Sequence, residues 1–114
     1  QLMQSDAGAV ELRSIQTRAY ETNDKTKMMR TALATLQDLG FVIDKADETL
    51  GTVSATKLDG YALRMTINVR AKGSEEMVVR ANAEYQSRAV IDPEPYQQFF
   101  NAYSKALFLE GHQI

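Results

Sequence analysis

The chain has 114 residues, of which 44% are hydrophobic and 25% are charged, and its formal net charge of −2 gives a pI of about 5.4. This length and composition indicate one folded domain with its own hydrophobic core and exclude a disordered chain. The slightly acidic balance disfavours nucleic acid and anionic membranes as partners, and the absence of cysteine excludes disulfides, thiolate nucleophiles and cysteine-based metal sites.

The N-terminal segment carries the weakest signals. Residues 1–9 are mostly small or polar and show no sustained periodicity, so we expect a flexible lead-in there, followed by a single domain over residues 10–114. From Val10 to Tyr20 the alternation of residues predicts a half-buried strand. The longest apolar runs, such as residues 106–109, are too short to span a bilayer. Because the chain begins at Gln1 instead of methionine, we expect that an upstream piece was removed.

A first amphipathic helix follows this strand. Residues 22–24 offer N-cap side chains, and Gly40 suits the left-handed position just past a helix end. Phe41 is placed to close a hydrophobic contact back onto Leu36, as in a Schellman ending. Between these signals, apolar residues recur at helical spacing: Met29, Ala32, Leu33, Leu36 and Leu39.

Two short strands and two turns come next. Phe41 begins a strand that gives way to an acidic turn over residues 44–49, and residues 51–56 are rich in β-branched side chains, which predicts a second strand. The dipeptide at residues 59–60, Asp-Gly, is a strong hairpin signal. A two-residue turn would place the even-numbered residues of the second strand inward, whereas a bulge or longer loop would reverse this, so the face stays unassigned.

The clearest hairpin joins residues 61–72 to residues 77–85, where odd-numbered residues are apolar in both strands. Because directly opposed residues share a face, paired numbers must sum to an even value, which excludes a two-residue loop. A three-residue loop over residues 73–75 pairs Val69 with Val79, Ile67 with Ala81 and, on the outer face, Arg64 with Glu84. The opposite charges of that last pair support the register.

A second amphipathic helix closes the chain, with Asp92 as N-cap, Pro93 at the first helical position and Gly111 as a stop. Its apolar stripe consists of Tyr96, Phe99, Phe100, Tyr103, Ala106 and Leu107. The elements predict an α+β fold, a two-layer sandwich in which two helices pack on one face of a four- to five-stranded, mainly antiparallel sheet, in the order β-α-β-β-β(-β)-α. We expect this stripe and the first helix to meet residues 63–69 and 79–83.

The sequence offers no constellation for catalysis. His112 is the only histidine and lies near the end of the chain, where a base is difficult to hold in place, so we interpret it as solvated. Asp44, Asp47 and Glu48 lack the ligand pattern and glycine of a calcium loop and suit a solvated turn. The isolated glycines form no phosphate-binding loop. We therefore predict a protein that is not an enzyme and has no cofactor and no metal.

Several side chains are candidates for binding. Arg64, Arg70, Lys72 and Arg80 share the outer face of the sheet, which has no aromatic platform for bases, so a solvated face is favoured and a protein-binding patch comes second. Phe108 and Leu109 point away from the helix stripe and extend the candidate partner surface, although packing against a neighbouring loop is the favoured interpretation for them. The alternative function is a carrier of small apolar ligands. Its cleft would be lined by residues for which a core position is the favoured interpretation: Tyr61, Met65, Tyr85, Phe99 and Tyr103.

Three segments together resemble a family of bacterial envelope lipoproteins of poorly defined function: residues 16–18 (Gln-Thr-Arg), residues 36–41 (Leu-Gln-Asp-Leu-Gly-Phe) and residues 50–57 (Leu-Gly-Thr-Val-Ser-Ala-Thr-Lys). The element order is also similar to helix-grip domains in lipoprotein subunits of the outer-membrane β-barrel assembly machine. The resemblance implies a signal peptide and a lipid-modified cysteine upstream of Gln1, and hence a periplasmic domain anchored to the outer membrane only through that lipid. It contributes no active-site residues.

The resemblance and the residues together give one functional expectation. We expect a non-catalytic periplasmic domain that acts in protein–protein interaction or as an accessory subunit of an envelope assembly or transport complex. Its expected partners are other envelope proteins or its own copies, and not nucleic acid.

Overall fold

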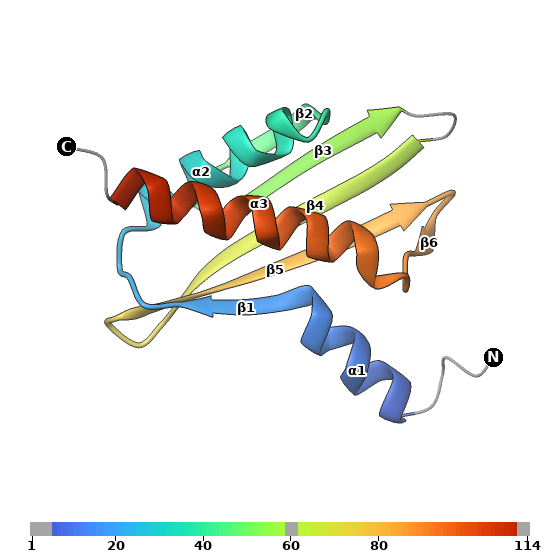
Figure 1. Ribbon diagram of the computed structural model, residues 1–114, viewed down its shortest axis with the longest axis horizontal. Helices are drawn as coiled ribbons and strands as arrows, with labels where there is room; N and C mark the ends of the chain where they lie inside the picture. Colours follow the sequence, from blue (N-terminus) through green and yellow to red (C-terminus); the bar gives the residue numbers. More distant parts are fainter. Residues whose placement is uncertain (1–5, 59–61, 112–114) are drawn as a thin grey trace.

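The computed structural model describes residues 6–58 and 62–111, which form an α+β two-layer sandwich (Figure 1). The elements in chain order are α1 (Asp6–Gln16), β1 (Thr17–Tyr20), α2 (Lys25–Asp38), β2 (Val42–Asp47), β3 (Thr52–Leu58), β4 (Ala62–Lys72), β5 (Glu76–Tyr85), β6 (Arg88–Ala89) and α3 (Pro93–Gly111). All strand pairs are antiparallel, in the order β1-β5-β4-β3-β2, with β6 paired to the end of β5. The predicted fold class is confirmed, with one helix and one short strand more than expected.

The additional helix, α1, corrects the prediction for the N-terminal segment. Residues 6–16 are helical and only Thr17–Tyr20 form a strand, so the strand from Val10 is wrong, and so is the lead-in for residues 6–9. Residues 1–5 lie outside the described residues. Leu12 and Ile15, three residues apart, pack against the core, as the period of a helix requires. In β1 it is Arg18 and Tyr20 that face the core, opposite the buried Val79 and Met77, whereas Thr17 and Ala19 lie on the other face.

Helix α2 begins and ends as predicted. The Asp24 carboxylate accepts a hydrogen bond from the Lys27 backbone N–H at 3.0 Å, which caps the first turn. At the other end, the Phe41 N–H donates to the Leu36 carbonyl at 2.9 Å and the Gly40 N–H donates to the Gln37 carbonyl at 3.0 Å. With Gly40 at a φ of +96°, these bonds form the expected Schellman motif.

The structure settles the face of β3 and extends β2. Val53 lies opposite Ile67 and Ala55 opposite Met65, and both β3 residues are fully buried. Leu58 pairs with Ala62, so three residues separate the strands, and a two-residue turn at 59–60 is excluded. Residues 59–61 themselves lie outside the described residues. Strand β2 continues to Asp47, so Asp44 belongs to a strand and not to the predicted acidic turn.

The hairpin of β4 and β5 has the predicted register. Val69 pairs with Val79, Ile67 with Ala81 and Arg64 with Glu84, around a three-residue loop at 73–75. A second hairpin, which the sequence did not reveal, joins β5 to β6 through Gln86 and Ser87, with φ values of 54° and 64°. Two successive positive φ values in a two-residue loop define a type I′ turn.

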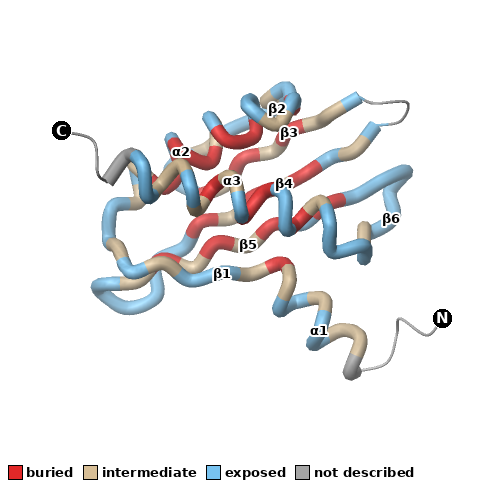
Figure 2. The backbone as a smooth tube through the Cα atoms, viewed as in Figure 1, coloured by how far each residue is buried: buried red, intermediate tan, exposed pale blue. Residues whose placement is uncertain are grey.

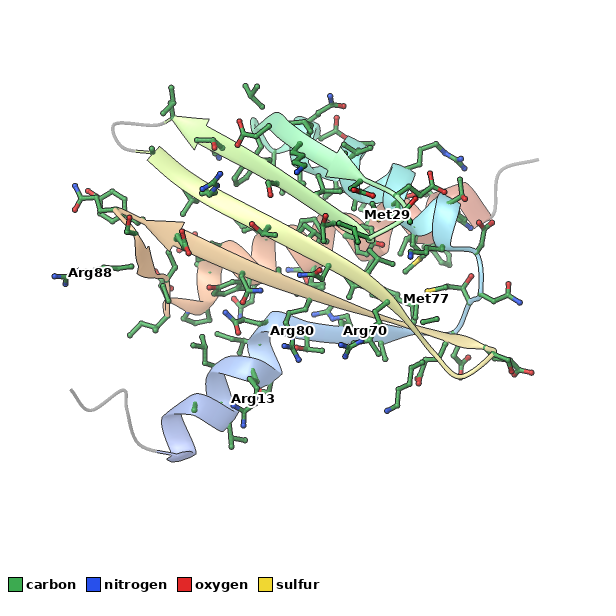
Figure 3. All side chains as sticks on the ribbon, turned by 180° about the vertical axis from the view of Figure 1, so that it is seen from behind. Arg13, Met29, Arg70, Met77, Arg80 and Arg88 are labelled. Carbon is green, nitrogen blue, oxygen red and sulfur yellow. The ribbon has the colours of Figure 1, made fainter. Side chains whose placement is uncertain are left out.

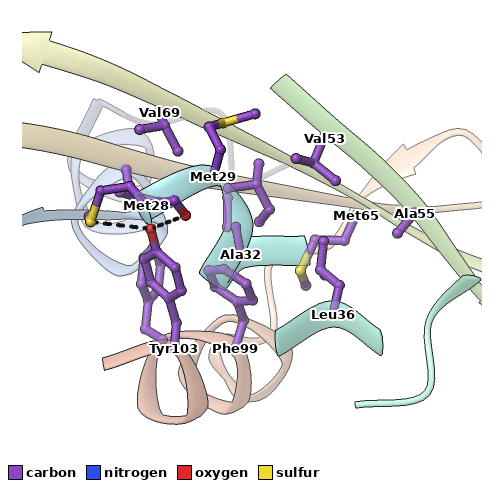
Figure 4. Close-up of a cluster of buried hydrophobic side chains, with 14 of the residues drawn as sticks. Met28, Met29, Ala32, Leu36, Val53, Ala55, Met65, Val69, Phe99 and Tyr103 are labelled. Carbon is purple, nitrogen blue, oxygen red and sulfur yellow. Dashed lines mark hydrogen bonds between the residues drawn. The ribbon is translucent and has the colours of Figure 1, made fainter. Parts of the chain in front are cut away.

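The core lies between the sheet and the two long helices, as the buried positions in Figure 2 show. The stripe of α3 contributes four fully buried aromatic residues, Tyr96, Phe99, Phe100 and Tyr103. Helix α2 contributes Met29 and Leu36, as expected, together with Met28 (Figure 4). Leu33 is only partly buried. Among the described residues, no helix is long and apolar enough to cross a membrane.

A buried hydroxyl closes the sheet edge beside β5, in the gap between the first residue of β1 and the last residue of β6. The Tyr96 hydroxyl accepts hydrogen bonds from the Ala83 N–H at 3.3 Å and the Gln16 side-chain amide at 3.2 Å, and it donates to the Val90 carbonyl. The Val90 N–H in turn donates to the Ala83 carbonyl at 2.8 Å. Helix α3 is thereby fixed to the sheet edge and to the end of α1.

Candidate functional site

One face of the sheet is left open. Figure 3 views the molecule from the side opposite to α2 and α3, where no helix covers the strands. Because side chains alternate along a strand and the odd-numbered residues of β4 and β5 are buried, the even-numbered residues form this face. Antiparallel sheets commonly expose one face in this way, so the residues that gather there are available for binding.

Arg70, Arg80, Asn68 and Val78 occupy four adjacent positions of β4 and β5 on the open face. Arg70 lies directly opposite Val78, and Asn68 lies directly opposite Arg80. Arg70 and Arg80 are therefore diagonal neighbours, which in an antiparallel sheet lie about 7–8 Å apart. Long guanidinium side chains at that separation can reach the same anionic group.

Lys25 and Leu50 complete a depression around this block. It has a volume of about 340 Å³, and its walls include Lys25, Leu50, Asn68, Arg70, Val78 and Arg80. Lys25 opens α2, and its ammonium donates to the Thr49 carbonyl at 3.4 Å. We refer to this feature as the basic depression.

Gly51 allows the Lys25 side chain and strand β4 to meet there. Its φ is +75°, and its carbonyl accepts a hydrogen bond from the Val69 N–H at 2.7 Å. A Cβ atom at this position would lie 2.3 Å from the Val69 carbonyl oxygen and 3.2 Å from Lys25 Cε. Only glycine fits the left-handed conformation and this close approach at once.

Two of the three cations of the basic depression have no charge partner within residues 6–58 and 62–111. Neither the Arg70 nor the Arg80 guanidinium forms an ion pair or hydrogen bond with another described residue. Among the described residues that line the depression, none is acidic, whereas three are cations. Like charges held together in this way favour an anionic group between them, and a guanidinium suits a carboxylate in particular because it can donate two parallel hydrogen bonds. Leu50 and Val78 add an apolar contact beside the charges.

The predicted partner surface divides into three places. Arg70 and Arg80 meet in the basic depression, but Arg64 lies farther along β4, opposite Glu84 and Thr56. Phe108 and Leu109 lie on α3, in the helix layer, and are 61% and 56% exposed. Arg64, Phe108 and Leu109 are therefore not part of the basic depression.

The residues of the alternative, ligand-carrying cleft are mainly core. Met65, Phe99 and Tyr103 are buried, and the rings of Phe99 and Tyr103 stack with centroids 5.1 Å apart. Tyr85 is 38% exposed, and Tyr61 lies outside the described residues. The interpretation of these residues as core is the one that their burial supports.

The acidic residues near β2 are dispersed among separate partners. The Asp44 carboxylate accepts from the Thr56 hydroxyl at 2.6 Å, Asp47 from the Leu50 N–H at 3.0 Å and Glu48 from the Thr26 hydroxyl at 2.7 Å. Within residues 6–58 and 62–111, no three histidine or acidic side chains are grouped so as to hold a metal ion. His112 lies outside the described residues.

Two tyrosines in the core have perturbed acidity. Burial raises the pKa of Tyr103 far above its ordinary value of 10, with a smaller contribution from Tyr20 nearby. Burial also raises the pKa of Tyr20, although the hydrogen bond to Ser104 and the Arg18 charge oppose the shift. The Tyr103 hydroxyl donates to the Met28 carbonyl at 2.9 Å (Figure 4). Because both pKa values are raised further above neutral pH, both phenols stay protonated there. This suits structural groups and not general acids or bases.

The basic depression is thus the site that the geometry assembles, and only part of it could be predicted from the sequence. Arg70 and Arg80 could be assigned to one face by parity, but Lys25 and Leu50 join them only through the turn at Gly51. Neither a protein-family model nor a curated protein matches the chain.

Proposed function

We propose that this chain is a non-catalytic protein-binding domain of the bacterial cell envelope, which docks acidic segments of partner proteins on the basic depression. The observation that carries the proposal is the convergence of Lys25, Arg70 and Arg80 on an open sheet face. A carboxylate that binds there gains charge-assisted hydrogen bonds, and an adjoining aliphatic side chain gains contact with Leu50 and Val78.

The envelope setting is supported by the resemblance of residues 16–18, 36–41 and 50–57 to envelope lipoproteins. In this proposal, a lipid anchor upstream of Gln1 holds the domain at the outer membrane on its periplasmic side. The domain then acts as an accessory subunit of an assembly or transport complex, and its partners are other envelope proteins or further copies of itself.

Site-specific crosslinking in the envelope tests the proposal. A photoreactive amino acid replaces Val78, which lines the basic depression, in the chain expressed in its native bacterium. The matched control carries the same amino acid at Asn101, an exposed position of α3 in the opposite layer. Mass spectrometry of the purified adducts identifies the protein that each position contacts.

We expect a defined protein adduct from position 78 and little or none from position 101. No adduct from position 78, or the same adducts from both positions, would contradict the proposal, because binding would then not involve the open face.

A further inference from the structure

A second depression, of opposite charge, adjoins the basic one. It has a volume of about 650 Å³ and lies between the loop after β1 and the tip of the β4–β5 hairpin. Its charged residues are Glu21, Lys72, Glu75 and Glu76, so three glutamates and one lysine leave it formally acidic. We call it the acidic depression.

The two depressions are consecutive on the open face. The Arg70–Val78 pair lines the basic depression, and the next pair on the same face, Lys72–Glu76, lines the acidic one. These pairs are two residues apart along each strand, about 7 Å. Tyr20 is opposite Met77, so Glu21 continues the register toward Glu76.

We propose that the partner of the basic depression is a second copy of this chain, bound through the acidic depression in a two-fold symmetric dimer. The proposal rests on the proposed function and names its partner. When two opposite charges lie side by side on one surface, a two-fold axis between them sets the acidic depression of each copy against the basic depression of the other. Both contacts then form at once, as a self-complementary interface requires.

The composition of the surface supports this pairing. Glu75, in the hairpin loop, and Glu21 are both exposed, so their carboxylates are accessible to a neighbouring copy. Leu50 is 69% exposed and Val78 half-buried, so apolar area lies beside the charges. Exposed ion pairs contribute little each and are screened by salt, so we expect a weak dimer whose dissociation constant rises by about tenfold between low and high salt.

Reciprocal charge reversal, measured by sedimentation equilibrium, tests the dimer. The first variant carries Arg70→Glu and Arg80→Glu, and the second carries Glu21→Lys and Glu75→Lys. In a homodimer of the first variant, two acidic surfaces would face each other at each contact. In a homodimer of the second variant, two basic surfaces would face each other. In an equimolar mixture, every contact again joins opposite charges. We expect each variant alone to sediment at the monomer mass of 12.8 kDa and the mixture to recover the dimer.

A matched control separates the interface from net charge. Arg88→Glu with Lys105→Glu changes the net charge by the same amount as the first variant, at exposed positions outside both depressions. This control is expected to dimerise like the unmodified chain and to gain no dimer when mixed with the second variant. If it associates with the second variant as strongly as the first variant does, the attraction is one of net charge and the proposal is wrong.

Self-association of the unmodified chain is the second readout, and it does not depend on whether any variant folds. If the unmodified chain remains at the monomer mass at millimolar concentration and low salt, the dimer proposal is wrong. If the crosslink from position 78 still reaches another protein in the envelope, only the dimer is wrong. If that crosslink is also missing, the proposed function fails with it.

Discussion

At the scale of single residues, Gly51 allows the turn before β3 to lie against β4 beside the basic depression. Replacement by alanine forces a side chain into the left-handed region, at a cost of about 1–2 kcal/mol, and moves the Val69 carbonyl, which lies 2.3 Å from the new Cβ. We predict that Gly51→Ala lowers the free energy of unfolding by at least about 2 kcal/mol in urea titrations.

Gly73→Ala is the matched control for this prediction. Gly73 has a φ of +71°, but a Cβ there meets nothing within 4 Å. Gly73→Ala should therefore lower the free energy of unfolding only by the cost of the left-handed backbone. Equal losses of stability for the two substitutions would show that the approach of Gly51 to β4 is not tight.

Tyr103 gives the chain a predictable response to alkali. Its pKa is raised in the folded state, so the unfolded state loses the phenol proton first, near pH 10. The stability that the neutral phenol contributes is therefore complete below about pH 10 and falls by about 1.4 kcal/mol per pH unit above it. We predict that Tyr103→Phe makes the decline of the urea midpoint at alkaline pH shallower, and an unchanged decline would contradict this explanation.

At the scale of elements, the turn between β5 and β6 holds two non-glycine residues in a conformation that favours Asn-Gly. Gln86 and Ser87 both have positive φ values, each of which carries a steric cost for a side chain with a Cβ. We predict that Gln86→Asn with Ser87→Gly raises the free energy of unfolding by about 1 kcal/mol, as measured by urea titration.

Ser74→Gly, in the loop between β4 and β5, is the control for this turn. Ser74 is not among the described residues with positive φ, so glycine relieves no strain there and only frees the unfolded chain. A gain in stability from Ser74→Gly as large as that from the double substitution would contradict the explanation.

Local signals predicted the elements that depend on their own residues. The helix cap within residues 22–24, the Schellman motif at Gly40 and the parity of β4 and β5 all specify structure within a few residues, and each is confirmed. Helix α1 could not be identified in this way, because Leu12 and Ile15 pack against parts of the chain far away in sequence.

The face of β3 and the composition of the site needed longer-range information. The face depended on the number of residues between Leu58 and Ala62, which the turn dipeptide alone did not fix. Likewise, Lys25 and Leu50 meet the arginines of β4 and β5 only once the turn at Gly51 is in place. Sequence parity therefore predicted which charges share a face, but not the depression that they form.

At the scale of the whole molecule, the two faces of the sheet have different roles. One is covered by α2 and α3 and holds the aromatic core, while the other is open and carries the basic depression. Edge strand β2 contains a bulge between Ile43 and Lys45, a feature that discourages pairing through the sheet edge. The proposed partner binding is accordingly on the open face and not along the β2 edge.

The most direct measurement of this claim is the yield of the position-78 crosslink when the depression loses its charges. In one chain Arg70→Ala and Arg80→Ala remove them, and in a second chain Arg64→Ala and Arg88→Ala remove the same net charge elsewhere. We predict a fall of about tenfold in the first chain, which corresponds to about 1.4 kcal/mol, and an unchanged yield in the second. Equal yields from the two chains would contradict the assignment of the basic depression as the binding surface.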